Sequence, residues 1–316
     1  MNRLTAIAFF AAVFIMWPCN AFAWNIPGHM LSGAIAYQLL QRENPAAIAR
    51  IRSILEKNPW YETHWTAQLE KLPETDRIEM LFMLAARWAD DIRTKDPSLS
   101  HPLWHYVGFP FKPEGEPPSI KTTPPLNPNL LTAIVENERI AQSGSEPEKR
   151  GIALAWLFHL VGDIHQPLDA IQMFSREYPH GDRGGMEMCV RVSLNGEPLE
   201  LHRLWDGVIT SSENTNQITS MASDLLHRFS TSPFRELDHP EPEAWAKESY
   251  EIAVKIAYEN GSLRGTPKGQ AKDCRAVNAV TFVSRDYPAR ARLNANRRMY
   301  LAGYRLADLL RATVER

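Results

Sequence analysis

Two histidines are each followed four residues later by an aspartate, within segments that are otherwise mostly apolar. His159 and Asp163 form the first pair, and His202 and Asp206 form the second. On a helix, side chains four residues apart lie on the same face, so each pair could bind one cation or form a simple ion pair. Unpaired imidazoles and carboxylates are costly to bury among apolar neighbours. Two such pairs in one chain therefore favour a metal site.

Two further polar side chains occur in similar surroundings. Asp90 ends an apolar run, and His105 stands between aromatic residues. Taken alone, Asp90 could be an acid at a solvated helix end, and His105 could be a buried structural imidazole. Histidine nitrogen and carboxylate oxygen are, however, common ligands of zinc. Together with the two histidine-aspartate pairs, these residues predict a His/Asp metal centre.

The first 23 residues have the pattern of an export signal. Arg3 supplies a positive charge, residues 4–17 are almost wholly apolar, and Ala21-Phe22-Ala23 has the small-x-small pattern of a cleavage site. An uncleaved anchor helix is the alternative, but the run is shorter than the ~20 residues that span a bilayer. We therefore expect a secreted or periplasmic protein, with no membrane span after signal cleavage.

Cleavage at this position would make Trp24 the first residue of the mature chain. A free terminal amino group loses its proton near pH 8 and could chelate a metal together with its own carbonyl oxygen, while His29 is close enough in sequence to add a third bond. Cys19 would leave with the signal, so that Cys189 and Cys274 remain. An oxidising compartment permits a disulfide between them, but their spacing in sequence leaves both the bonded and the free state open.

The composition is that of an ordinary folded protein. The chain has 316 residues, 44% of them hydrophobic and 23% charged, with a formal net charge of −2. A protein that grips duplex nucleic acid through a broad basic surface usually has a clear excess of lysine and arginine. Any nucleic acid that this chain binds must therefore be attracted by something other than a basic surface.

The elements that carry these side chains are predicted to be helices. Apolar residues recur at helical intervals over 32–40, 78–88, 130–140, 152–161, 245–258 and 294–310. Proline clusters at 110–128 and 233–242 predict loops. Alternation around Asn195-Gly196 predicts a small β-hairpin near 190–201. Because no long linker interrupts the helices, we expect an all-α fold with a single multi-helix domain over 24–316.

The order and combination of these motifs resemble the zinc-dependent single-strand nucleases and 3′-nucleotidases. This family of type I nucleases is typified by mung bean nuclease and shares its helical fold with the zinc phospholipases C. The resemblance runs from residue 24 to the end of the chain. It rests on Trp24 with Gly28-His29, Trp88-Ala89-Asp90, His105-Tyr106, residues 159–168, Gly184-Gly185, Leu201-His202-x-x-Trp205-Asp206 and Ala302-Gly303-Tyr304-Arg305-Leu306-Ala307.

The resemblance implies three zinc ions. The first would be bound by Asp90, His105, His159 and Asp163. The second would be bound by His29, by the Trp24 amino and carbonyl groups, and by Asp163, which would bridge the two ions. The third would use His202, Asp206 and Asp169, although relatives usually have histidine at this last position. A carboxylate can also ligate zinc, and His165 or water could complete the third site instead.

The implied activity is hydrolysis of single-stranded DNA and RNA to products with 5′-phosphates, together with removal of the phosphate from 3′-nucleotides. The attacking group would be a hydroxide shared by two zinc ions. Asp90 and Asp163 would be catalytic, and Arg93 would bind the phosphate. No stable protein partner is implied. Two other functions fit the same motifs: a zinc phospholipase C, and a secreted metal-binding protein without catalysis. Gly108 and Met186 differ from the usual residues of the family, which bears on substrate preference.

Overall fold

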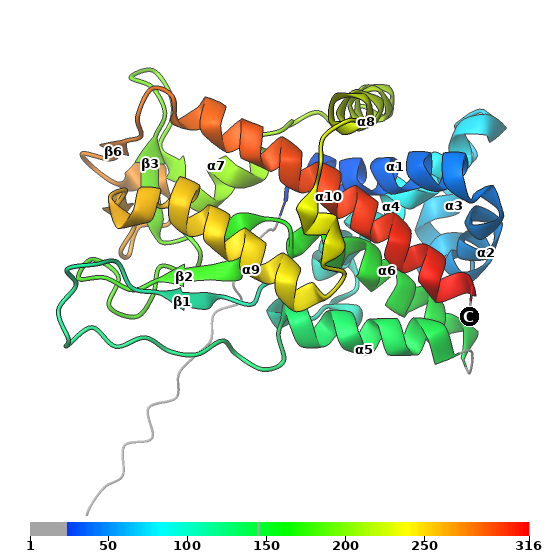
Figure 1. Ribbon diagram of the computed structural model, residues 1–316, viewed down its shortest axis with the longest axis horizontal. Coiled ribbons are helices and arrows are strands. Elements are labelled where there is room, and N and C mark those ends of the chain that lie inside the picture. The colour runs from blue at the N-terminus through cyan, green and yellow to red at the C-terminus, as the bar shows by residue number, and fades with distance from the viewer. Residues whose placement is uncertain (1–23, 144–145, 316) are drawn as a thin grey trace, which may run out of the picture.

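The computed structural model describes residues 24–143 and 146–315. The predicted export signal, residues 1–23, lies outside the described residues. Four helices form the centre of the molecule (Figure 1): α1 (Ile26–Glu43), α4 (Glu74–Lys95), α6 (Pro147–Asp163) and α10 (Tyr287–Glu315). In α1 every residue from Pro27 to Leu40 is buried, and in α6 every residue from Ala153 to Asp163 is buried. Helices buried on all sides form the core of a bundle.

Close contact between α1 and its neighbours depends on small residues. A Cβ atom at Gly33 would lie 2.6 Å from the carbonyl oxygen of Phe82 in α4. A side chain at this position would therefore force α1 and α4 apart. The two helices carry His29 and Asp90, so their close packing brings two predicted metal ligands toward each other.

Shorter helices surround the central four. The α-helices are α2 (Pro45–Leu55), α3 (Thr66–Leu69), α5 (Leu130–Ser143), α7 (Leu201–Gly207), α8 (Thr215–Phe229) and α9 (Pro242–Ile252). The 3₁₀-helices are η2 (Pro97–Leu99), η3 (Pro102–His105), η4 (Pro167–Ala170), η5 (Arg235–Asp238), η7 (Glu259–Gly261) and η8 (Cys274–Ala276). Two π-helical turns complete the set: η1 (Tyr61–Trp65) and η6 (Ala253–Ala257), the second of which directly continues α9.

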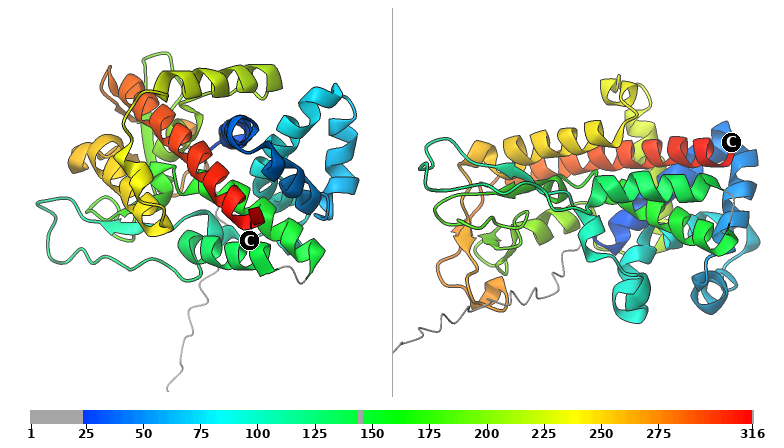
Figure 2. Two further views of the ribbon diagram at one scale, coloured as in Figure 1. Left: turned by 45° about the vertical axis from the view of Figure 1, so that its right-hand side comes forward. Right: turned by 90° about the horizontal axis from the view of Figure 1, so that it is seen from below.

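The small strands form two sheets. In the first, β1 (Phe109–Phe111) runs parallel to β2 (Ile171–Met173). In the second, β3 (Met188–Arg191) pairs with β4 (Leu199–Glu200), β5 (Thr266–Pro267) and β6 (Thr281–Phe282). Figures 1 and 2 place both sheets at one end of the bundle, with α2 and α3 at the other end. The prediction of an all-α fold with a small β element is confirmed.

Most of the local predictions hold. The six predicted helical segments lie in helices, except that the segment 245–258 ends in the π-helical turn η6 and its last residue lies outside it, whereas α2, α3 and α8 were not predicted. The two predicted loops also contain part of β1 and all of η5. In α8 only Ile218, Ala222, Leu225 and Leu226 are buried, and this narrow apolar stripe is a weak signal in sequence. The predicted hairpin exists as β3 and β4, but its first strand begins at 188 and ends at 191, earlier than expected. Its partners β5 and β6 come from a distant part of the chain.

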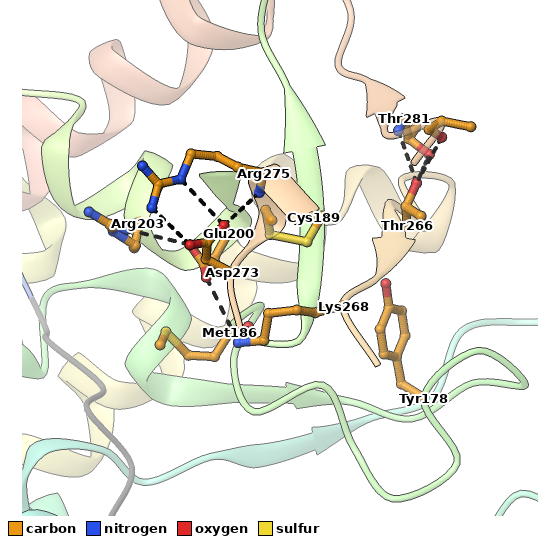
Figure 3. Close-up of a disulfide and its surroundings, with 12 residues drawn as sticks. Tyr178, Met186, Cys189, Glu200, Arg203, Thr266, Lys268, Asp273, Arg275 and Thr281 are labelled. Atoms are coloured by element: carbon orange, nitrogen blue, oxygen red, sulfur yellow. Dashed lines mark hydrogen bonds and ion pairs between the residues drawn. A yellow bond between two sulfur atoms is a disulfide. The ribbon is translucent and has the colours of Figure 1, made fainter. Parts of the chain in front are cut away.

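A disulfide connects Cys189 in β3 to Cys274 in η8, with the two Cα atoms 5.5 Å apart (Figure 3). Of the two alternatives left open by the sequence, the bonded state is therefore observed. The bond attaches the segment that carries β5 and β6 to the strand that leads toward α7. Within the described ranges, no helix is long and apolar enough to cross a membrane.

Candidate metal centre

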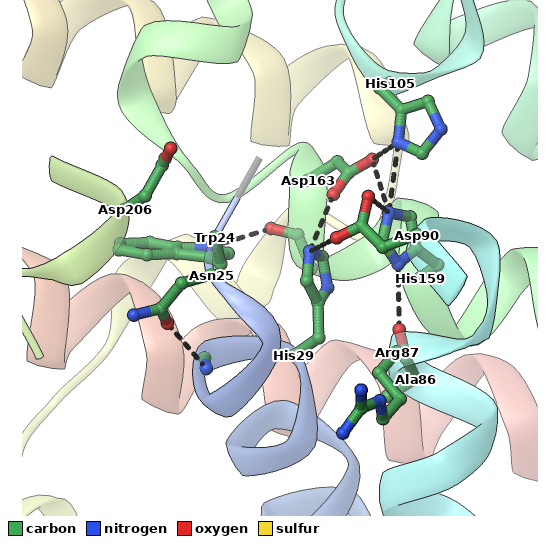
Figure 4. Close-up of polar contacts among 12 residues, drawn as sticks. Trp24, Asn25, His29, Ala86, Arg87, Asp90, His105, His159, Asp163 and Asp206 are labelled. Atoms are coloured by element: carbon green, nitrogen blue, oxygen red, sulfur yellow. Dashed lines mark hydrogen bonds and ion pairs between the residues drawn. The ribbon is translucent and has the colours of Figure 1, made fainter. Parts of the chain in front are cut away.

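Five predicted ligands from four elements converge at the middle of the bundle (Figure 4). In two groups, each of three side chains, the donor atoms all lie within 4.8 Å of one another: His29, His159 and Asp163, and Asp90, His105 and His159. None of the five residues is more than 6% exposed. The elements α1, α4, η3 and α6 each contribute at least one of them.

Asp163 lies at the centre of this cluster. Its Oδ1 atom is 3.3 Å from His29 Nε2, and its Oδ2 atom is 3.0 Å from His105 Nδ1. Oδ2 is also 3.3 Å from His159 Nε2, one helical turn earlier on α6. Asp90 approaches from the other side, with its oxygens 3.9 Å from His29 Nε2 and 4.0 Å from His159 Nε2. The two oxygens of Asp163 thus face different imidazoles, as a bridging carboxylate would.

Backbone groups orient the imidazoles. His159 Nδ1 donates a hydrogen bond to the carbonyl oxygen of Ala86 at 2.8 Å, which turns Nε2 toward Asp163. The His29 ring stacks on the His159 ring with centroids 3.9 Å apart. A Cβ atom at Gly162 would lie only 2.8 Å from His29 Nδ1. The glycine therefore makes room for a histidine from α1 beside the end of α6.

Burial determines the charge state of the cluster. It lowers the pKa of His29 and of His105 well below the usual value, so both imidazoles are neutral and keep electron pairs available for a metal. Burial also raises the pKa of the Asp163 carboxyl to about 6, against the opposing attraction of His159. His29 Nδ1, His105 Nε2 and both oxygens of Asp90 make no hydrogen bond in the described structure.

These nitrogen and oxygen atoms without hydrogen bonds could serve as ligands of a metal ion. A buried polar atom without a partner costs about 1–3 kcal/mol, and a bound divalent cation would satisfy several of them together. Neutral imidazole nitrogens and carboxylate oxygens are a suitable donor set for zinc. The residues present therefore fit the predicted cofactor.

A second grouping, the Asp169 site, consists of Asp169, His202 and Asp206. His202 Nε2 lies 3.6 Å from Asp169 Oδ1 and 3.6 Å from Asp206 Oδ1. The Asp169 site is looser than the first cluster, in which each set of three donor atoms lies within 4.8 Å. His202 Nδ1 donates to the carbonyl oxygen of Gly184 at 2.8 Å, which directs Nε2 toward the two carboxylates.

His165 does not belong to this grouping. Its Nδ1 atom donates to the carbonyl oxygen of Val161 at 2.7 Å, and its Nε2 atom accepts from Arg305 at 2.9 Å. Both ring nitrogens therefore have partners away from His202. The structure therefore does not support the alternative in which His165 completes the third metal site, because this imidazole contacts Arg305 of α10 instead.

Trp24 and Asn25 link the two groupings. The Trp24 indole donates to the carbonyl oxygen of Gly162 at 3.0 Å, and the amide of Asn25 donates to the carbonyl oxygen of Asp206 at 3.4 Å. The Asn25 side chain caps α1 by accepting from Gly28 at 3.0 Å. The start of the described chain is thus held next to Asp163. Trp24 can act as a terminal ligand only if the chain is cleaved after residue 23, and that residue lies outside the described ones.

Arg93 lies beside the cluster, one turn after Asp90 on α4. Its Nη2 atom is 3.2 Å from Asp90 Oδ1, and its side chain is 12% exposed. The arginine is therefore not a solvated helix-end residue. Its predicted contact with phosphate remains a prediction.

Sequence reasoning missed three groups that orient the ligands. Two are the backbone carbonyls of Ala86 and Gly184, which leave no signal in residue types. The third is Gln166, whose Nε2 atom donates to Asp206 Oδ1 at 2.7 Å and whose Oε1 atom accepts from the amide of Leu168 at 2.7 Å. The position of Gln166 between two predicted ligands, Asp163 and Asp169, is the sequence signal that could have identified it.

An all-α bundle with buried clusters of imidazoles and carboxylates is a scaffold that could hold metal ions in His/Asp sites. The chain belongs to the S1/P1 nuclease family, whose sequence model matches residues 24–315. Members of this family are zinc enzymes. The chain is also similar to Endonuclease 3 from Arabidopsis thaliana, with 31% identity over 132 residues. That match covers 37% of this chain and 41% of the Arabidopsis protein. The predicted family is confirmed.

Proposed function

We propose that this protein is a secreted, zinc-dependent nuclease. It hydrolyses single-stranded DNA and RNA, and it removes the phosphate of 3′-nucleotides. The observation that carries the proposal is the position of Asp163 between three imidazoles that come from three separate elements. Membership of the S1/P1 nuclease family supports the same reaction class.

The proposed ligands follow the two groupings. One zinc ion is held by Asp90, His105, His159 and Asp163. A second is held by Asp163, His29 and the terminal amino and carbonyl groups of Trp24. A third metal ion is held by Asp169, His202 and Asp206. When bound, the metal ions act as Lewis acids toward the phosphate and lower the pKa of water from ~15.7 to near 7.

The chain's own residues position the substrate. Arg93 presents a guanidinium that can donate two parallel hydrogen bonds to phosphate oxygens. The ion pair with Asp90 at 3.2 Å holds this guanidinium next to the cluster. Asp163 fixes the separation of the two sites that share it, because its carboxylate is anchored at the end of the rigid helix α6. The phosphorus atom is thereby held where a water molecule can attack it.

A preference for single strands follows from burial and charge. The five clustered ligands are at most 6% exposed, so a substrate must bend toward them. A single strand is flexible and offers unpaired bases for stacking on aromatic side chains. A net charge of −2 gives the protein no broad basic surface for a duplex. The metal cluster and Arg93 supply the positive charge.

Secretion is proposed from the leader and the disulfide. Residues 1–23 have the pattern of an export signal, and disulfides such as Cys189–Cys274 persist in oxidising compartments. Cleavage after residue 23 would also release the amino group of Trp24 for the metal centre. N-terminal sequencing of exported protein should begin at Trp24.

The proposed activity is tested with processed protein stripped of metal by a chelator and then supplied with zinc. Denatured DNA, duplex DNA, a 3′-nucleotide and lecithin serve as substrates. We expect zinc to restore cleavage of denatured DNA and release of phosphate from the 3′-nucleotide, with slower cleavage of the duplex. Release of phosphocholine alone would establish a phospholipase C instead. Zinc binding without any hydrolysis would establish a metal-binding protein without catalysis.

A further inference from the structure

The two groupings differ in donor chemistry. The central cluster consists of His29, Asp90, His105, His159 and Asp163, and it offers three imidazoles with two carboxylates. The Asp169 site offers one imidazole with two carboxylates. We propose that the Asp169 site discriminates less between Zn²⁺ and the harder cation Mn²⁺ than the central cluster does, so that Mn²⁺ in excess can occupy it. The inference rests on the proposed function only in assuming that the protein binds divalent metals.

The preference follows from the ligand atoms. Carboxylate and water oxygens suit Mg²⁺ and Mn²⁺, whereas imidazole nitrogen suits Zn²⁺. Zn²⁺ binds more tightly than Mn²⁺ at most sites of either type. The ratio of the affinity for Zn²⁺ to that for Mn²⁺ should therefore increase with the number of nitrogen ligands. This ratio should be smallest at the Asp169 site, where His202 is the single nitrogen ligand of the set.

Asp169 is built into the site and has an unused oxygen. Its backbone carbonyl accepts hydrogen bonds from the amides of Val107 at 2.9 Å and Gly108 at 3.2 Å. The residue is only 1% exposed, and its Oδ2 atom makes no hydrogen bond in the described structure. A buried carboxylate oxygen without a partner, next to a second carboxylate and an imidazole, is a site for a cation.

Arg93 acts electrostatically on Asp169, and Arg203 acts on Asp206, but in the described structure neither arginine forms a direct ion pair with these carboxylates. In the part of the chain that the structure describes, neither Asp169 nor Asp206 has a lysine or arginine partner within 4.0 Å. Gln166 contacts Asp206 Oδ1 at 2.7 Å, but its amide is neutral and orients the carboxylate without cancelling its charge. A divalent cation bound at this site would therefore compensate the two negative charges. Most of its protein ligands would be oxygen atoms.

The experiment loads metal-free, processed protein with both metals. Zn²⁺ and Mn²⁺ are supplied together, bound Mn²⁺ is measured by electron paramagnetic resonance, and both metals are located by anomalous diffraction at their absorption edges. With Mn²⁺ in increasing excess over Zn²⁺, we expect Mn²⁺ to replace Zn²⁺ at the Asp169 site at concentrations at which the central cluster still holds Zn²⁺. Asp169→His, which adds a nitrogen donor, should raise the preference of this site for Zn²⁺ over Mn²⁺ by roughly tenfold or more. The matched control is His227→Ala, which removes an exposed histidine of α8.

Several outcomes would overturn the inference. These are an unchanged metal preference in Asp169→His, Mn²⁺ in the central cluster instead, or no metal at the Asp169 site of the wild-type protein. Should Asp169→His fail to fold, the anomalous maps of the wild-type protein still decide the matter. Failure of the proposed function looks different, because the metals would then bind as described while denatured DNA stayed intact.

Discussion

At the scale of single residues, Asp163 is the side chain on which the centre depends. Both of its oxygens contact imidazoles, at distances from 3.0 to 3.3 Å. A carboxylate in this position could share its charge between two metal ions. Its replacement should therefore affect more than one metal ion at a time.

We expect Asp163→Asn to lose both metal and activity. The amide keeps the shape of the side chain but removes its charge and one oxygen. Metal content should fall by two ions per chain, and cleavage of denatured DNA should fall by about a hundredfold or more, since changes even beyond the ligands cost 10–100-fold. Metal analysis and a nuclease assay measure the two effects. His227→Ala should retain both, and a fully active Asp163→Asn would contradict the mechanism.

Metal affinity should decrease in acid. The pKa of Asp163 is raised to about 6 by burial, and the pKa of His159 is also raised, through Asp163 and Asp90 acting against burial. As the pH falls through these values, protons occupy the atoms that would bind metal. Zinc affinity should thus be greatest above pH 7 and should fall by about tenfold per pH unit for each proton displaced. Competition with a zinc chelator between pH 5 and pH 8 measures this, and a flat profile would exclude it.

At the scale of elements, the turn of residues 181–185 positions the Asp169 site. The carboxylate of Asp182 accepts from the amide of Met173 at 2.8 Å and from the hydroxyl of Tyr258 at 2.6 Å. Gly184 has a φ of +62°, and its carbonyl orients His202. A Cβ atom there would lie 2.3 Å from the carbonyl oxygen of Leu168. The turn thus connects the backbone of η4 to the orientation of a ligand on α7.

We expect Gly184→Ala to destabilise the protein by about 2 kcal/mol or more, because strain and a clash with backbone act together. It should also weaken metal binding at His202 more than in the central cluster. Gly115→Ala is the matched control, since its φ is +83° but a Cβ atom there would meet nothing within 4 Å. Thermal unfolding and metal content measure the two effects. Equal behaviour of the two variants would show that the turn does not position His202.

At the scale of the whole molecule, we expect some parts of the structure to depend on the disulfide more than others. Cys189–Cys274 joins positions 85 residues apart and attaches β5 and β6 to β3 (Figure 3). The central helices α1, α4 and α6 lie outside the segment between the two cysteines. We therefore expect the packing of these three helices to depend little on the bond.

We expect the double variant Cys189→Ser with Cys274→Ser to lose about 4.6 kcal/mol of unfolding free energy, as loop-closure entropy predicts for a loop of this length. Amide hydrogen exchange should increase mainly over 262–286, whereas α1 and α6 should stay protected. Denaturant unfolding and exchange mass spectrometry test this. Unchanged stability, or loss of protection throughout α6, would contradict this division of the molecule.

The sequence by itself determined the helices and the kinds of donor they carry. Helical periodicity and the i, i+4 spacing of His159 and Asp163 depend only on neighbours along the chain, so they can be predicted locally. Tertiary structure alone decided that His29 from α1 and His105 from η3 meet Asp163, that the cysteines are bonded, and that His165 faces Arg305. These outcomes depend on how distant helices pack, through contacts such as Gly33 against Phe82 and Gly162 against His29, and residue types along one segment do not encode such distances.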